Sequence, residues 1–446
     1  MPRYQRPELP ASSQWPSSQA YGKDQVVSTK ALNKNIGLAE FFNDARLNQL
    51  IELALKNNRD LRVAALNVEL LSAQYRIGLA QGFPQINAIG SGQKQKEIIV
   101  GGSVVKAGNY NVSLGVTSYE LDLWGHVRSL KKQALENYFA TIEAQRSAQI
   151  SLIAQVAIQY LTQRALQEQL IETQKTQKSV EDYYQLIKAS YDLGNASLLD
   201  LRLADVQMQT ARVNFFNYQR LLAQAENALV LLIGQPIPSN LPEPRVFNLQ
   251  KVLSDIPAGL PSDLMERRPD ILEAEHQLKA ANANIGAARS AFFPKILLTG
   301  SGGIASVKLT DLFTGSSVWN FAPQITMPIF DAGANRASLD AAKISKSIQV
   351  AQYEKAIQTA FQEVADALTA RASYNDQMKA QEALVKAQQQ RYDLADIRYR
   401  NGIDSYLTVL IAQQDLYTAE QNLIQLQLAR LSNLITLYKA LGGSWN

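Results

Sequence analysis

The chain has 446 residues, no cysteine and a formal net charge of +4 that is dispersed along it. The lack of cysteine excludes a disulfide framework, a thiol nucleophile and a cysteine-based metal site. No Lys/Arg-rich run points to a nucleic-acid partner. The two histidines, His126 and His276, are expected to be surface or interface residues rather than metal ligands.

The chain contains an internal duplication. The segment Asn58–Pro84 resembles Arg268–Pro294 at an offset of 210 residues. Further matches, at an offset of 208, are Gly125 with Gly333, Gly194 with Gly402, and Gly234 with Gly442. Such a nearly constant offset predicts two similar halves of one body, although the length alone would suggest about three domains.

The first 40 residues are rich in Pro and Ser and are expected to be extended. Repeat 1, residues 41–235, begins with a helix that leads to strands at 85–97 and 107–121. The second of these strands alternates Tyr110, Val112 and Leu114 with Asn111 and Ser113, as a strand with one apolar face does.

Two very long helices are expected to follow in repeat 1, at residues 126–190 and 197–233. Proline is absent from 85–235 and glycine from 126–193 and 195–233, and these are the strongest helix breakers. Helices this long need lateral neighbours along their length, as in coiled coils.

Residues 236–261 are expected to form a Pro-rich equatorial connector that wraps around the helices. Repeat 2, residues 262–446, then shows the same order of elements as repeat 1. We expect a helix, strands at 295–308 and 317–330, and long helices at 334–400 and 404–441.

Four strands per chain cannot close a barrel, and two isolated hairpins would expose their edges. If subunits pool their strands, the edges disappear, and a barrel of more than about eight strands leaves a lumen. The pattern therefore predicts an oligomeric tube but does not set the number of copies. No apolar run reaches the roughly 18 residues that a membrane-spanning helix needs.

The sequence resembles the outer-membrane factor family, the TolC/OprM-like exit ducts, and most closely the OprM-like lipoprotein branch. The segments that carry the resemblance are Tyr4–Pro7, Asn57–Arg62, Glu120–Gly125, Pro257–Leu260, Arg268–Pro294 and Tyr438–Gly443. Together they span essentially the whole chain. The resemblance implies an α+β membrane protein, a homotrimer with a 12-stranded β-barrel in the bacterial outer membrane and an α-helical barrel in the periplasm.

The same resemblance implies the function of a passive exit duct in multidrug efflux, with no catalytic group and no cofactor. Its implied partners are a periplasmic adaptor protein and an inner-membrane transporter of the resistance–nodulation–division class. Members of this branch carry a signal peptide and a lipid-modified cysteine shortly before the segment that corresponds to Tyr4–Pro7. This chain has neither, and we expect a trimmed N-terminus on a natively lipid-anchored protein.

By resemblance, the two turns between the long helices form the periplasmic tip and bind the helical hairpin of the adaptor. The docking candidates are Gly194, Ala196, Ser197, Gly402, Ile403 and Ser405. For the two glycines, permitting the tight reversal of the chain is an equally good explanation.

The gate is expected just beyond the second turn. There the OprM-like pattern usually reads Leu-Asp-Ala-Gln/Glu-Arg, whereas this chain has Leu410-Ile411-Ala412-Gln413-Gln414-Asp415. Ile411 and Gln414 thus replace an acidic and a basic residue. We predict a gate of apolar rings from Leu407 and, if it faces the lumen, Ile411, because inward apolar side chains exclude water and ions. Three further gate candidates, Tyr399, Asp200 and Arg202, are expected to lock neighbouring helices.

Other functions are less well supported. Asp122 and Asp331 precede long helices and are expected to cap them. The Gly-rich stretch Gly300–Gly303 lacks the Lys-Ser/Thr of a phosphate-binding loop. Within the duct class, metal-ion efflux and protein secretion remain alternatives, and a soluble coiled-coil scaffold would explain the helices but not the strands.

Overall fold

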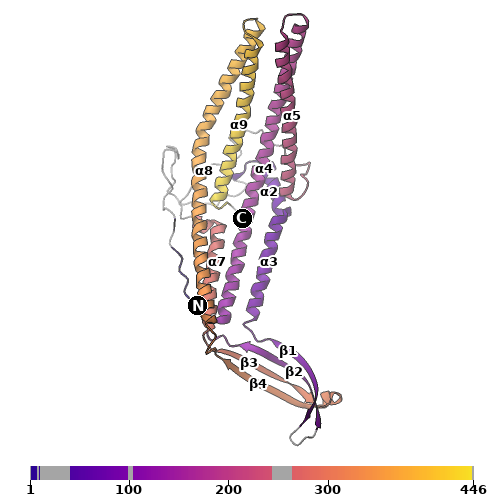
Figure 1. Cartoon of the computed structure of the whole chain (residues 1–446), viewed down its shortest axis with the longest axis vertical. Coiled ribbons are helices and arrows are strands. Elements are labelled where there is room, and N and C mark those ends of the chain that lie inside the picture. The colour runs from indigo at the N-terminus through magenta and orange to yellow at the C-terminus, as the bar shows by residue number, and fades with distance from the viewer. Residues whose placement is uncertain (1, 8–9, 11–40, 99–103, 244–263, 444–446) are drawn as a thin grey trace. The chain divides into compact units, whose positions relative to one another are not determined.

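The computed structural model describes residues 2–7, 10, 41–98, 104–243 and 264–443 (Figure 1). The segment Pro257–Leu260, most of the expected connector and most of the first 40 residues lie outside these ranges. The chain forms two compact units, and each unit draws on both repeats. Unit 1 contains Met1–Glu8, Leu66–Glu143 and Glu273–Lys355, and unit 2 contains Leu9–Ala65, Ala144–Leu272 and Ala356–Asn446. The compact units therefore cut across the two repeats.

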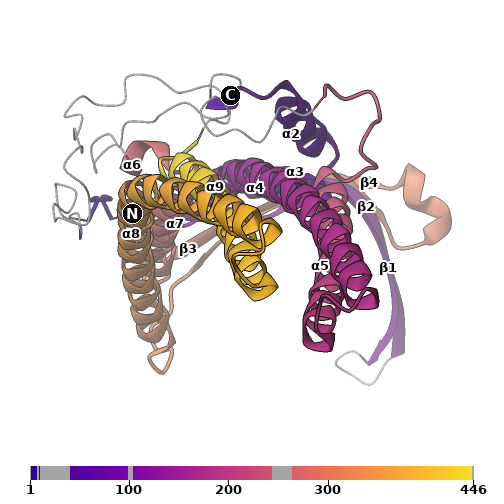
Figure 2. The same cartoon turned by 90° about the horizontal axis from the view of Figure 1, so that it is seen from above.

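The long helices lie close to the positions expected from the sequence. In repeat 1 they are α4, His126–Asp192, and α5, Leu198–Ile233. In repeat 2 they are α8, Ala334–Arg400, and α9, Tyr406–Ala440. Both α4 and α8 have 67 residues, which is about 100 Å at about 1.5 Å per residue. Within unit 2, α4–α5 and α8–α9 form two helical hairpins (Figures 1 and 2).

Shorter helices precede the strands of each repeat. They are α2, Ala45–Asn57, and α3, Arg59–Ala80, in repeat 1, and α6, Leu264–Arg267, and α7, Pro269–Ser290, in repeat 2. Asp44 caps α2 by accepting from the backbone N–H groups of Arg46 and Leu47, and it also accepts a hydrogen bond of 3.0 Å from the Tyr160 hydroxyl. Among the described helices, none is both long and apolar enough to cross a membrane.

Unit 1 contains one four-stranded antiparallel sheet in the order β1-β2-β3-β4 (Figure 1). The strands are β1, Ile86–Ile98, β2, Val104–Glu120, β3, Lys295–Ser306, and β4, Ser316–Thr326. Because β2 belongs to repeat 1 and β3 to repeat 2, the central pairing joins the two repeats. Among the described residues, β1 and β4 each have a partner strand on one side only.

Two strand bounds differ from those expected by three residues or more. β2 begins at Val104 rather than 107, because pairing with β1 extends it to the Ile98–Val104 pair. β4 ends at Thr326 rather than 330, where Pro328 lacks the N–H that a continued ladder needs. A 3₁₀ helix, η3, Leu309–Thr314, lies between β3 and β4.

The register gives the sheet two different faces. Paired residues of neighbouring strands point to the same side, and successive residues alternate. The apolar face carries Ile86, Val112, Leu114, Val116, Ile296, Leu298, Trp319, Phe321 and Ile325. The polar face carries Asn87, Ser91, Asn111, Ser113, Thr299, Ser301, Asn320 and Gln324. In the isolated chain the apolar face is open, and Trp319 is 83% exposed.

Both aspartates before the long helices cap them, which confirms that expectation. Asp122 accepts from the backbone N–H groups of Val127 at 3.1 Å and Arg128 at 2.9 Å. Asp331 accepts from the N–H groups of Gly333 at 3.0 Å and Asn335 at 2.9 Å. Each carboxylate therefore satisfies backbone N–H groups at the N-terminal end of a long helix.

Candidate functional site

The two turns that end the long hairpins have the same backbone geometry. Gly194 has φ +79° and Gly402 has φ +70°, a left-handed conformation that favours glycine. The Asn195 N–H donates to the Ser190 carbonyl at 2.8 Å, and the Ile403 N–H donates to the Arg398 carbonyl at 2.9 Å. Each bond joins residues five positions apart, as in the Schellman motif that ends a helix. The left-handed glycine is therefore required by the turn itself.

The docking candidates of the two turns lie at the surface of the chain. Gly194, Ser197, Gly402, Ile403 and Ser405 are exposed and Ala196 is half-buried. The two serines differ in what they do. Ser197 forms a capping box with Asp200, whose backbone N–H donates to the Ser197 hydroxyl at 3.1 Å, whereas Ser405 makes no side-chain capping bond.

Behind the two turns lies a hydrophobic cluster in unit 2, here called the tip core. Its buried members are Tyr183, Ile187, Ala204, Ala395, Tyr406, Val409, Leu410 and Ala412, which come from α4, α5, α8 and α9. Tyr399 of α8 packs against it, with its ring centroid 6.5 Å from that of Tyr183 and 5.8 Å from that of Tyr406. Tyr399 of α8 therefore contacts aromatic residues of two other helices, α4 and α9.

The sequence did not single out the polar contacts around the tip core. The Tyr183 hydroxyl of α4 donates to Asp396 of α8, and the Arg400 guanidinium donates to the same carboxylate at 2.8 Å. Burial alone would raise the pKa of Asp396, but the hydrogen bonds from Arg400 and Tyr183 outweigh burial and hold that pKa below its usual range. The sequence could have indicated the pair of Asp396 and Arg400, because an Arg four residues after an Asp lies on the same side of a helix. The contact of Asp396 with Tyr183 of α4 depends on tertiary structure.

The gate candidates of α9 lie on its exposed side. Leu407 is 47% exposed and Ile411 is 41% exposed, and their spacing of one helical turn places them on one face. Leu410, between them, is buried in the tip core. Leu407 and Ile411 therefore form an apolar strip that is partly exposed in the single chain.

Polar neighbours of this strip are engaged within the chain. Gln414 donates to the Gln207 side chain of α5 at 2.8 Å. Asp415 accepts from Arg391 of α8 at 2.5 Å. The aspartate that follows the gate segment is therefore paired with a basic residue of the neighbouring helix.

Within the single chain, the hydrogen bonds of Asp200 and the ion pair of Arg202 lie on their own helix, α5, and its cap. Asp200 caps the helix to which it belongs. Arg202 forms an ion pair of 3.8 Å with Asp205 on the same helix. Since charged groups one turn apart meet on a helix surface, both contacts are local to α5.

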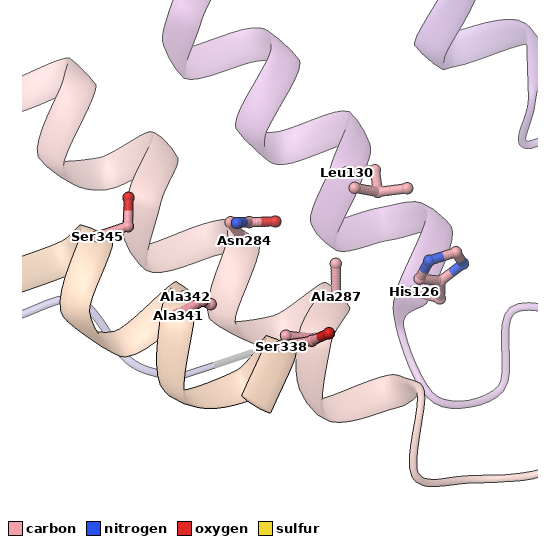
Figure 3. A pocket seen from close by; sticks show the side chains of 9 residues that line it. His126, Leu130, Asn284, Ala287, Ser338, Ala341, Ala342 and Ser345 are labelled. Carbon is pink, nitrogen blue, oxygen red and sulfur yellow. The ribbon is translucent and has the colours of Figure 1, made fainter. Parts of the chain in front are cut away.

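An open groove of about 570 Å³ lies in unit 1 between α4, α7 and α8 (Figure 3). Its lining is His126, Leu130, Asn284, Ala287, Ala288, Ser338, Ala341, Ala342 and Ser345. These are mostly small side chains, without a convergent set of charged groups. His126 contacts Glu120 at 3.0 Å and His276 contacts Glu136 at 2.6 Å, and the described residues contain no group of three or more potential metal ligands.

Comparison with known proteins identifies the family. The sequence matches the family described as outer membrane efflux protein twice, over residues 50–235 and 260–443, so that each repeat matches once. The chain belongs to the outer membrane efflux protein family. The protein is therefore an outer-membrane channel of a bacterial efflux pump and not an enzyme.

Relatives of this outer membrane efflux protein support that assignment along its whole length. It is 49% identical to the toluene efflux pump outer membrane protein TtgC of Pseudomonas putida, over 100% of this chain and 92% of the relative. It is 41% identical to the cation efflux system protein CusC of Escherichia coli, over 100% of this chain and 95% of that protein. The solved open state of the MtrE channel of Neisseria gonorrhoeae matches with a TM-score of 0.88 and 39% identity, over 99% of this chain and 97% of that chain.

Proposed function

We propose that three copies of this chain form one exit duct, in which their twelve strands close a barrel in the outer membrane. In this proposal the duct conducts drugs and other small amphiphiles out of the cell. It receives them from a periplasmic adaptor and an inner-membrane transporter of the resistance–nodulation–division class.

The observation that carries the proposal is the two-faced sheet with two open edges. Unpaired edges are unfavourable, and closure with other copies removes them. The apolar face and the polar face suit a barrel that contacts lipid outside and water inside. Four strands per chain make twelve in a trimer, which is enough to leave an open lumen.

The height of the apolar face supports the same arrangement. From Ile296 to Ile304, its last apolar residue on this face, β3 rises about 26 Å at about 3.3 Å per residue. Strands of membrane barrels tilt by about 40°, which reduces this rise to about 20 Å along the barrel axis, most of the roughly 25 Å of the apolar band in such barrels.

Within this duct, the tips of the hairpins bind the adaptor and close the pore. Gly194, Ala196 and Ser197 of one turn and Gly402, Ile403 and Ser405 of the other are the docking candidates. Leu407 and Ile411 close the pore as a hydrophobic constriction, because they lie on one exposed side of α9. Gln414 lies one turn of α9 beyond Ile411 and lines the pore there. Tyr399 holds the surrounding helices together through the tip core.

Similarity to TtgC favours apolar and amphiphilic substrates, because that relative serves a toluene pump. Similarity to CusC, which serves a cation efflux system, favours metal-ion efflux as the second candidate. Expression in cells that lack their own duct distinguishes the two. Restored resistance to solvents and drugs supports the first candidate, and restored resistance to metal ions alone supports the second.

The proposal is tested by the oligomer mass in detergent, followed by single-channel conductance in a planar bilayer. We expect the mass of three chains and small, flickering currents from a mostly closed pore. A monomer that never inserts or conducts would overturn the trimeric duct.

A further inference from the structure

The apolar face of the sheet continues into three lysines at the end where β1 leads to β2. Lys94 lies opposite Gly108, and Lys96 lies opposite Lys106. Because side chains alternate along a strand, these lysines are on the same face as Val112 and Leu114. All three are exposed. We call Lys94, Lys96 and Lys106 the lysine cluster.

On the apolar face, Tyr110 lies between Val112 and the lysine cluster. A methyl group at Gly92 would come within 2.9 Å of the Tyr110 ring, and one at Gly108 within 3.2 Å. The ring therefore lies over the two glycines next to the cluster. Tyrosine is enriched where the hydrocarbon core of a membrane meets the headgroups. Along the strands the apolar residues come first, then Tyr110 and then the lysines, which is the order expected from hydrocarbon to headgroup.

None of the three lysines forms an ion pair within the described part of the chain. Lys96 and Lys106 are direct cross-strand neighbours, and like charges in that position destabilise a sheet. By contrast, Lys295, at the opposite end of β3, pairs with Glu120 at 3.0 Å. Among the described residues of the sheet, the lysines without an ion pair are therefore those beyond Tyr110.

We propose that the lysine cluster binds the phosphate groups of anionic lipid headgroups. The inference rests on the proposed function, because it requires the apolar face to contact lipid. A lipid is favoured over a soluble anion since the lysines continue the apolar face. Their long alkyl stems can lie along that face while the ammonium groups reach the headgroups. An anion between Lys96 and Lys106 would also relieve their mutual repulsion.

The test measures lipid selectivity of the purified protein in phosphatidylcholine bilayers. The association of spin-labelled phosphatidylglycerol relative to spin-labelled phosphatidylcholine is compared for the wild type and the Lys94→Gln, Lys96→Gln, Lys106→Gln variant. We expect the wild type to prefer phosphatidylglycerol, and the preference to fall by roughly fivefold for each lysine in contact with a headgroup. Added salt should weaken the wild-type preference, because exposed charges are screened.

Two matched variants control for charge and folding. Replacing all three lysines by Arg keeps the charge and should retain the preference. Replacing Lys178, Lys188 and Lys386 of α4 and α8 by Gln removes the same net charge from exposed helical positions and should leave the preference unchanged. An equal preference in the wild type and the cluster Gln variant overturns the proposal, as does an equal loss in the helical Gln variant.

Conductance of the same preparations separates this proposal from the proposed function. If the wild type inserts and conducts but shows no preference for phosphatidylglycerol, the lysine cluster is not a headgroup site and the duct stands. If the wild type neither inserts nor conducts, the membrane orientation of the apolar face is wrong, and both proposals fail.

Discussion

Two side chains distinguish this tip from the pattern of the OprM-like branch. Ile411 replaces an acidic residue and Gln414 a basic one. Gln414 is bonded to Gln207, and Asp415 is bonded to Arg391. The exposed side of α9 at this level is thus apolar, which favours a constriction that closes by excluding water rather than by pairing charges.

Replacing Leu407 by Ser should raise the resting conductance several-fold, because a hydroxyl lets water wet the constriction. Single-channel recording of the purified protein measures this. The control is Leu199→Ser, the equivalent position in repeat 1, where the leucine is 69% exposed. We expect the control to conduct like the wild type. Unchanged conductance in Leu407→Ser would exclude Leu407 from the gate.

At the scale of elements, the two hairpins are duplicated in backbone but not in their caps. Both turns use a left-handed glycine and the same pattern of hydrogen bonds. The N-terminus of α5 is closed by Ser197 and Asp200, but α9 has Thr408 in place of that aspartate, and Ser405 makes no capping bond. In the second turn Asp404 instead accepts from Arg398 at 2.6 Å. The helices of the two hairpins therefore differ in how firmly their first turns are held.

Removal of the capping hydroxyl should loosen only one hairpin. Ser197→Ala should destabilise the first turn of α5 by about 1 kcal/mol, and Ser405→Ala should have little effect on α9. Hydrogen–deuterium exchange of the first-turn amides of α5 and α9 measures both effects. Equal acceleration of exchange in the two variants would contradict the difference in capping.

At the scale of the whole molecule, the two-faced sheet controls how the chain meets its surroundings. Leu114 lies on the apolar face and Asn320 on the polar face, and both are exposed in the single chain. In the proposed barrel the first faces lipid and the second faces the lumen. The exposed fraction of a side chain in the single chain does not distinguish lipid from lumen. A charged side chain at the same position does, because it is costly where it contacts lipid.

A charge on the apolar face should impair insertion. Leu114→Lys should cost about 2–4 kcal/mol if the residue lies near the middle of the membrane. Asn320→Lys places the same charge on the polar face and should insert like the wild type. The folded fraction after refolding into lipid vesicles, followed by gel mobility with and without heating, measures both. Equal losses in the two variants would mean that the faces are not separated as proposed.

The features that the sequence alone predicted are those that depend on local patterns. Long stretches without Gly or Pro predicted the four long helices to within a few residues, because helix propensity and its interruption are local properties. Alternation around Tyr110 predicted β2, and the matching glycines at Gly194 and Gly402 predicted both turns. The twofold family match agrees with the duplication.

The tertiary structure decided what depends on contacts between distant segments. The register of β1 and β2 brought Lys94 and Lys96 to the same face as Lys106, since one residue of slip would have put them on opposite faces. The link from Tyr183 to Asp396 joins residues 213 positions apart, which no local periodicity reveals. The same holds for Asp415, whose partner Arg391 belongs to another helix. The capping box of Asp200 with Ser197 is local to α5, but the sequence does not show which of several reachable partners a carboxylate takes.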